Sequence, residues 1–97
     1  MQDIPPDPPP PPIESLIDYP SRFPIKVMGL NVTGFAHAVT HIAAQFDPGF
    51  DAASVELRLS KGGKYLGVTV TVTATSREQL DELYRTLSTH PMVKMVL

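Results

Sequence analysis

Hydrophobic and polar residues alternate along two stretches of the sequence, Val55–Ser60 and Leu66–Ala74. A period of two is typical of a β-strand that buries one face and exposes the other. The two stretches are joined by a short segment, Lys61–Lys64, with two glycines at its centre. This arrangement predicts an antiparallel hairpin over Val55–Ala74.

The residues before the hairpin predict one strand and one helix. Phe23–Gly29 alternates like a strand, and we expect its pairing to begin after Pro24, because proline has no backbone N–H to donate. Thr33–Phe46 repeats apolar residues with the helical period, and Asn31 or Thr33 can cap its first turn. The expected apolar stripe of this helix consists of Phe35, Val39, Ile42, Ala43 and Phe46.

The residues after the hairpin predict a second helix and a last strand. Ser76 and Gln79 have the spacing of a capping box, which marks the start of a helix. Asp81 and Arg85 stand four residues apart on its polar side and predict an ion pair. Pro91 ends the helix, and a strand is expected over Met92–Leu97. The apolar stripe of this second helix consists of Leu80, Leu83, Tyr84 and Leu87.

The predicted order of elements is strand, helix, strand, strand, helix, strand. With right-handed crossovers this order gives a ferredoxin-like α+β fold. We expect an antiparallel four-stranded sheet of order 4-1-3-2 with both helices on one face. The expected core is Phe23, Ile25, Val27, Phe35, Val39, Ile42, Phe46, Leu57, Leu59, Val68, Val70, Val72, Leu80, Leu83, Leu87, Val93 and Met95.

Composition divides the chain into two parts. Residues 1–18 contain seven prolines and four acidic residues and predict a solvated, proline-rich tail that lacks packed structure. Residues 19–97 are long enough for one small domain. The sequence has no cysteine and no apolar stretch long enough to span a membrane. We therefore expect a cytoplasmic protein without membrane attachment.

Two local patterns invite a chemical interpretation, and each has a simpler structural one. The glycines of Lys61–Lys64 fit a tight turn, and the segment lacks the spacing and the following helix of a phosphate-binding loop. His37 and His41 lie on one helix face, but no third metal ligand accompanies them. No nucleophile motif such as GxSxG is present. We therefore expect no enzymatic activity, no cofactor and no metal.

The face of the sheet opposite the helices is the most promising surface. From residue 19 onward the chain has eight Lys and Arg against six Asp and Glu, which is too weak an excess for a nucleic-acid site. Its central strands also lack the aromatic residues that stack on bases in RNA-binding sheets. We expect contact with an unknown protein partner or a second copy. The predicted interaction surface is Lys26, Met28, Arg58, Thr69, Thr71, Thr73 and Lys94, with Glu56 and Val96 beside them.

Several short pieces of the chain, in their order, resemble one known family, and they span Tyr19–Leu97. They are Tyr19-Pro20, Phe23, Lys26–Gly29, Ser60–Gly62 with Tyr65, Thr69–Ala74, Leu83-Tyr84 with Leu87, and the terminal Val93 and Met95–Leu97. The chain resembles the YbeD-like family of small bacterial proteins, sometimes labelled lipoate regulatory proteins. The resemblance implies a fold similar to ACT regulatory domains and a regulatory role linked to lipoate metabolism. It supplies no catalytic residues.

The resemblance to ACT domains also implies a second function, the binding of a small molecule near the first strand-to-helix loop. The residues that would bind a carboxylate there are Gly29, Asn31, Thr33 and Gly34. An ordinary capped turn explains the same residues. Three hypotheses therefore remain: a non-enzymatic regulatory or adaptor domain that works by protein contact, a small-molecule sensor, and a domain that binds single-stranded RNA through the open sheet.

Overall fold

The computed structural model of the chain describes residues 18–97. The predicted proline-rich tail, apart from its last residue, lies outside the described residues.

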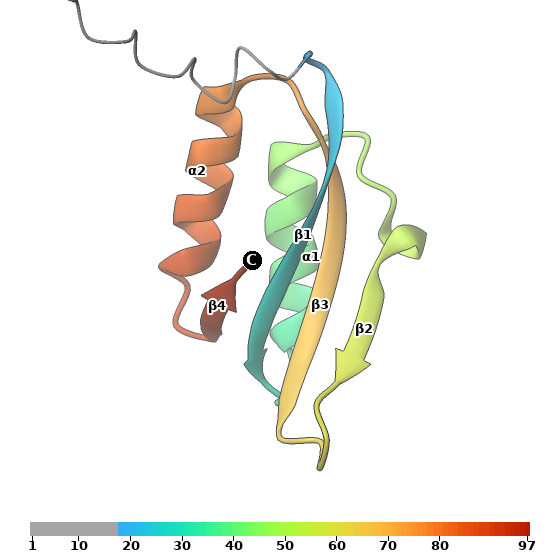
Figure 1. Cartoon of the computed structure of the whole chain (residues 1–97), viewed down its shortest axis with the longest axis vertical. Helices are drawn as coiled ribbons and strands as arrows, with labels where there is room; N and C mark the ends of the chain where they lie inside the picture. The colour runs from blue at the N-terminus through green and yellow to red at the C-terminus, as the bar shows by residue number, and fades with distance from the viewer. Residues whose placement is uncertain (1–17) are drawn as a thin grey trace, which may run out of the picture.

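The described residues form a four-stranded antiparallel sheet with two helices packed on one side (Figure 1). In chain order the elements are β1 (Ser21–Leu30), α1 (Phe35–Phe46), the 3-10 turn η2 (Ala52–Ser54), β2 (Glu56–Leu59), β3 (Tyr65–Ala74), α2 (Arg77–Ser88) and β4 (Val93–Val96). The strand order is β2-β3-β1-β4. The predicted ferredoxin-like α+β fold and its strand order are therefore confirmed.

β1 pairs along its whole length with β3, from Ser21 opposite Ala74 to Leu30 opposite Tyr65. The expectation that pairing begins only after Pro24 was wrong. Lys26 exchanges backbone hydrogen bonds with Leu97, so its N–H points to the β4 side of β1. Because backbone groups alternate sides along a strand, the nitrogen of Pro24 points to that side too. β4 does not extend that far, so the missing N–H of Pro24 costs β1 no hydrogen bond to β3.

The core lies between the helices and the inward face of β1 and β3. Most of the expected core residues are buried, namely Ile25, Val27, Phe35, Val39, Ile42, Val68, Val70, Val72, Leu80, Leu83 and Leu87. Phe23, Phe46 and Val93 are half-buried at its margin, and Leu66 and Ala74 of β3 join the buried set. Tyr84 of α2 is half-buried against it, and burial raises the pKa of its phenol.

Two predicted core residues, Leu57 and Leu59, are 59% and 55% exposed. They pair with Val68 and Leu66 and therefore lie on the inward face of the sheet, as the alternation predicted. β2 is an edge strand, however, and α1 packs mainly against β3. The sequence places these leucines on the correct face, but the prediction that they are buried was wrong because the helices do not cover that edge.

The face assignment along β4 was also wrong. Gly29 pairs with Val93 while Met28 pairs with Met95, so Lys94 is an extra residue in a β-bulge. The bulge reverses the alternation after it. Met95, expected in the core, is 52% exposed, while Val96, expected on the open side, packs against the core.

The start of α1 and one ion pair within α2 differ from the prediction, whereas the Ser76 cap of α2 agrees with it. The N-cap of α1 is Gly34 in a left-handed conformation, instead of Asn31 or Thr33. The Ser76 hydroxyl caps α2 by accepting from the Gln79 N–H, as predicted. The Gln79 side-chain oxygen accepts from the Thr75 N–H, whereas a capping box would have it accept from the Ser76 N–H. The predicted Asp81–Arg85 pair does not form.

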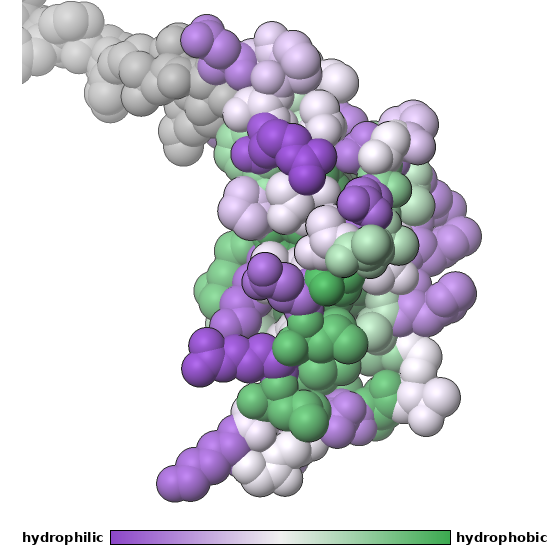
Figure 2. Space-filling view, turned by 90° about the vertical axis from the view of Figure 1, so that its right-hand side faces the viewer, coloured by the Kyte–Doolittle hydropathy of each residue, from purple (hydrophilic) through white to green (hydrophobic). Residues whose placement is uncertain are grey.

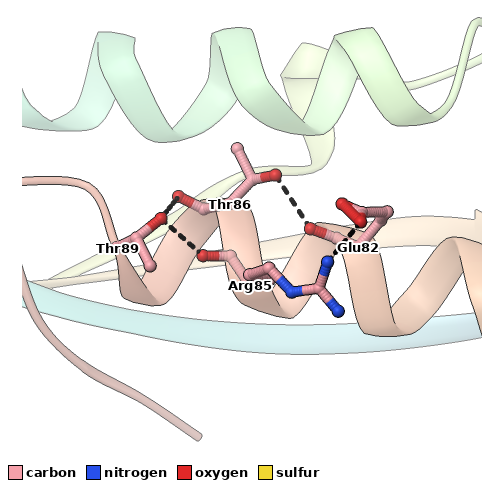
Figure 3. Close-up of polar contacts among 4 residues, drawn as sticks. All are labelled: Glu82, Arg85, Thr86 and Thr89. Carbon is pink, nitrogen blue, oxygen red and sulfur yellow. Dashed lines mark hydrogen bonds and ion pairs between the residues drawn. The ribbon is translucent and has the colours of Figure 1, made fainter.

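The two charges pair with other residues of α2. Arg85 bonds Glu82 at 2.6 Å, and Asp81 lies 3.7 Å from Arg77. Figure 3 shows the Arg85–Glu82 pair together with Thr86 of α2 and Thr89, the residue that caps the end of this helix. The hydroxyls of these two threonines donate to the carbonyls of Glu82 and Arg85, respectively. All of these contacts are exposed, so they contribute little to the stability of the domain.

A buried carboxylate ties the end of α1 to the sheet. Asp47 is 6% exposed; its Oδ1 accepts from the Gly49 N–H at 3.0 Å and its Oδ2 from the Thr73 N–H at 2.9 Å. Thr73 lies on β3 beyond the last residue that pairs with β2. The carboxylate thus replaces the strand partner that β3 lacks at this point.

Candidate functional site

The second side of the sheet, which we call the open face, is not covered by either helix (Figure 1). Strand alternation and register place on it Arg22, Pro24, Lys26, Met28 and Leu30 of β1, Tyr65, Gly67, Thr69, Thr71 and Thr73 of β3, Glu56 and Arg58 of β2, and Met95 of β4. Tyr65 is the one aromatic residue of this set. It lies at the end of β3, with the Lys64 ammonium 5.5 Å from its ring centre.

A hollow lies on the open face beside Gly67. A side chain on Gly67 would approach Lys26 Cε at 3.1 Å, so the Lys26 stem runs across the place that a side chain would fill. The larger part of the hollow is about 540 Å³ and is lined by Lys26, Glu56, Leu57, Arg58 and Thr69. A smaller part of about 190 Å³ continues along Lys26 and Arg58 to Met28, Leu59, Ser60 and Gly67. We call both parts together the Gly67 hollow.

The charges around the Gly67 hollow favour an anionic or hydroxyl-bearing group. Lys26 and Arg58 line both parts of it, whereas Glu56 lines only one. Thr69 adds a hydroxyl that can donate or accept. The hollow is shallow and open to solvent, so it suits a side chain presented by another molecule better than an enclosed small ligand.

Six of the seven predicted interaction residues share the open face. Lys26, Met28, Arg58, Thr69, Thr71 and Thr73 all lie on it. Arg22 lies opposite Thr73, and its Nη1 is 3.4 Å from the threonine hydroxyl. Lys94 is exposed at the bulge of β4 and has no paired position on β1.

The four residues predicted to bind a ligand near the β1–α1 loop do not form one site, because each has different neighbours. Gly29 is buried, and a Cβ there would lie 2.4 Å from the Met92 carbonyl oxygen and 2.7 Å from the Phe35 ring. Asn31 donates its side-chain amide to the Gly63 carbonyl at 3.1 Å. Thr33 and Gly34 are exposed at the start of α1. Gly34 has a φ of 91°, and no described atom lies within 4 Å of the position of its absent Cβ.

The glycines at the hairpin tip are explained by backbone conformation. Gly62 and Gly63 have φ angles of 88° and 78°, which favour glycine over other residues. The Gly63 N–H donates to the Ser60 carbonyl and closes the turn. Nothing in this geometry requires a bound phosphate.

The helical spacing of His37 and His41 on α1 is enough to explain why their side chains lie together. The rings of His37 and His41 stack with centres 6.3 Å apart. Within residues 18–97 no group of three or more His, Asp or Glu side chains is placed to hold a metal ion. In the same part of the chain, neither helix has the length and hydrophobicity needed to cross a membrane.

Sequence reasoning missed Gly67 and the exposure of Leu57 and Leu59. A signal for Gly67 was present, because a glycine inside a strand often marks close approach of another group. No comparable signal marked the leucines, since their exposure depends on how far α1 reaches across the sheet.

Solved structures define the fold class of the chain as ACT-like. The solution structure of protein HP0495 from H. pylori is similar with a TM-score of 0.71, at 17% identity, over 100% of this chain and 98% of that one. The ACT domain from GTP pyrophosphokinase of Chlorobium tepidum is similar with a TM-score of 0.60, at 15% identity, over 78% and 84% of the two chains. At such identities the likeness concerns the fold alone.

The chain belongs to a family of proteins of unknown function, DUF493, whose model matches residues 14–97. It is 68% identical over 87 residues to a UPF0250 protein of Bordetella pertussis, which covers 90% of this chain and 96% of the relative. It is 63% identical over 97 residues to a UPF0250 protein of Leptothrix cholodnii, which covers the whole of both chains. The family resemblance read from the sequence is confirmed, and the match begins before Tyr19.

Proposed function

We propose that this protein is a non-enzymatic adaptor or regulatory domain that acts by protein contact through its open face. The observation that carries the proposal is the Gly67 hollow, which Lys26 and Arg58 both line on an uncovered face of the sheet. A solvated face of an antiparallel sheet is common in itself. A hollow with two cations over a glycine gives this face a specific place to receive an acidic side chain of a partner.

The rest of the open face supports contact with a folded partner. Thr69, Thr71 and Thr73 form a half-buried row of hydroxyls along β3. Met28 and Met95, paired across β1 and β4, provide a flexible apolar area next to it. Arg and Met are enriched in protein interfaces, and a polar margin around an apolar area is their usual arrangement.

The family resemblance suggests which partners to test first. It implies a regulatory role in lipoate metabolism, so the enzymes that attach lipoate are the first candidates. The proposal itself rests on the chemistry of the open face and does not depend on that pathway.

Photo-crosslinking in the native cell tests the open face directly. We expect a photoreactive residue at Thr71 to give a specific protein adduct, and the same residue at Gln45, exposed on α1, to give none. For the partner so identified, Lys26→Glu should weaken binding by about tenfold or more, because a charge-assisted contact becomes a repulsion. Lys61→Glu at the hairpin tip is the matched control and should leave binding unchanged. Equal adducts from both positions, or equal loss in both lysine variants, would contradict the proposal.

A small-molecule sensor is the second candidate, and the start of α1 favours it. None of the described side chains caps this helix, and the exposed Gly34 leaves its first turn open. Helix N-termini attract carboxylates through their free N–H groups and the helix dipole.

A thermal-shift screen with amino acids, lipoate and octanoate tests the sensor. A ligand at about 100 times its Kd stabilises the folded state by about 2.7 kcal/mol, which should raise the Tm by roughly 10 °C or more in a domain of this size. Thr33→Asp should abolish that shift by placing a carboxylate at the same helix end, whereas Thr33→Asn should retain it. A flat response to the whole panel would argue against the sensor.

A further inference from the structure

We infer that the free edge of β2 pairs with the β2 edge of a second copy of this chain, antiparallel and with Leu57 opposite Leu57. The inference concerns an edge of the sheet, so it goes beyond the partner proposed for the open face and does not rest on it.

The β2 edge combines exposed backbone with exposed apolar side chains. β2 pairs on one side with β3, and no strand of residues 18–97 pairs with its other side. Leu57 and Leu59 are each more than half exposed on this strand. Figure 2 faces the β2 side of the molecule and shows hydrophobic surface in the lower half of that side, between hydrophilic side chains. An edge of this kind is a template for a further strand.

The other edge of the sheet is less suited to pairing. β4 is as short as β2 but has a bulge at Lys94, and bulges are one of the features that protect edge strands from pairing. β2 pairs with β3 in unbroken register from Glu56 to Leu59 and contains no proline. The β2 edge therefore lacks a bulge and a proline, and its protection is limited to its short length and its two charged side chains, Glu56 and Arg58.

Backbone geometry fixes which residues of β2 point outward. The Ser60 N–H donates to the Tyr65 carbonyl, so the backbone groups of Ser60 point toward β3. Because these groups alternate along an antiparallel strand, those of Arg58 and Glu56 point toward β3 as well, and those of Leu57 and Leu59 point outward. A second copy must therefore hydrogen-bond to Leu57 and Leu59.

Side-chain charge then selects one register. With Leu57 opposite its counterpart, Glu56 lies opposite Arg58 of the second copy, and Arg58 lies opposite its Glu56. A shift by two residues in either direction places Glu56 opposite Glu56 or Arg58 opposite Arg58. Unlike charges directly opposite each other stabilise a strand pair and like charges destabilise it. Of these three registers, the Leu57-centred one alone avoids both repulsions and also pairs each Glu56 with an Arg58.

The same register is complementary on the inward side of the sheet. The Leu57 side chains of the two copies meet there, and Leu59 of each copy lies opposite Val55 of the other. The Leu57 N–H and C=O groups of the two copies can exchange two hydrogen bonds across the axis. The Val55 N–H already donates to the Ala52 carbonyl, so beyond the Leu57 pair the Leu59 N–H can still donate to the Val55 carbonyl of the other copy. One twofold operation thus matches the central backbone pair, the charges and the apolar side chains, as an interface between identical chains requires.

Charge-swapped variants of the full chain test this register by sedimentation equilibrium. We expect the native chain to form dimers in the micromolar to millimolar range. Glu56→Arg alone and Arg58→Glu alone each create two like-charge pairs and should raise the dimer Kd by about tenfold or more. The double variant Glu56→Arg/Arg58→Glu should dimerise like the native chain. An equimolar mixture of the two single variants should form a heterodimer, because each then faces its opposite.

Control variants distinguish this interface from a general effect of charge and from a dimer built on another surface. Lys61→Glu changes net charge as much as Arg58→Glu does and should leave the dimer intact. Equal Tm values show that the variants are folded.

Three outcomes would overturn the inference: a native chain that stays monomeric up to millimolar concentration, single variants that dimerise like the native chain, or a mixture of the two single variants that stays monomeric. A dimer through the open face would instead be lost in Lys26→Glu and would not be restored by mixing, which also overturns it. Partner binding through Lys26, measured separately, is unaffected by these outcomes.

Discussion

Gly29→Ala is expected to lower the free energy of unfolding by about 3 kcal/mol, the upper part of the range for overpacked cores. An added methyl group would lie 2.4 Å from the Met92 carbonyl oxygen and 2.7 Å from the Phe35 ring. Both neighbours are held in place, the first by the backbone leading into β4 and the second by complete burial in the core. For a domain of this size the Tm should fall by roughly 10–20 °C in a calorimetric scan.

Gly49→Ala is the matched control for that measurement. Its added methyl group would meet only Asp47 Oδ1, at an ordinary contact distance of 3.6 Å. It should therefore change the Tm by no more than a few degrees. If Gly29→Ala proved as stable as the native chain, close packing would not explain the glycine at this position. A role of Gly29 in ligand binding would then be the better explanation.

Much of the fold follows from local patterns in the sequence. Alternation defines β2 and β3, and the glycines at the hairpin tip adopt the positive φ angles that a tight turn needs. The apolar stripes of both helices became the helical part of the core. These features depend on residues close together in the chain, so a single sequence contains the information for them.

The errors arise where a distant part of the chain decides the outcome. Leu57 is exposed because no helix reaches across β2, and the strand itself carries no sign of that. A single bulge residue, Lys94, exchanges the faces of Met95 and Val96. The Gly67 hollow is lined by side chains of three strands, and Lys26, forty-one positions before Gly67, lies beside that glycine only in the folded sheet. The candidate site was therefore only partly predictable. The sequence predicted which residues of the central strands lie on the open face, but it did not predict the Gly67 hollow or the exposed edge of β2.

Asp47→Ala is expected to lower the free energy of unfolding by about 2–3 kcal/mol. The side chain accepts two backbone N–H groups, of Gly49 and Thr73, and alanine would leave both without their partner. Thr73 is affected most, because β2 ends before it can supply a strand partner. Hydrogen exchange should show faster opening at the Ala74 end of β3 and at the end of α1, in addition to a lower Tm.

Two further variants distinguish this bridge from a general effect of losing an acidic residue. Asp51→Ala removes an exposed carboxylate that caps η2 through the Ala53 N–H, and it should cost no more than about 1 kcal/mol. Asp47→Asn keeps one oxygen acceptor but turns an amide N–H toward the other donor, so its loss should lie between those of the two alanine variants. Equal losses in Asp47→Ala and Asp51→Ala would show that the bridge to Thr73 adds nothing. The hydrogen-exchange measurement also concerns the free edge of β2. Asp47 bonds to β3 just beyond the residues that pair with β2, and β2 is held in place by its pairing with β3.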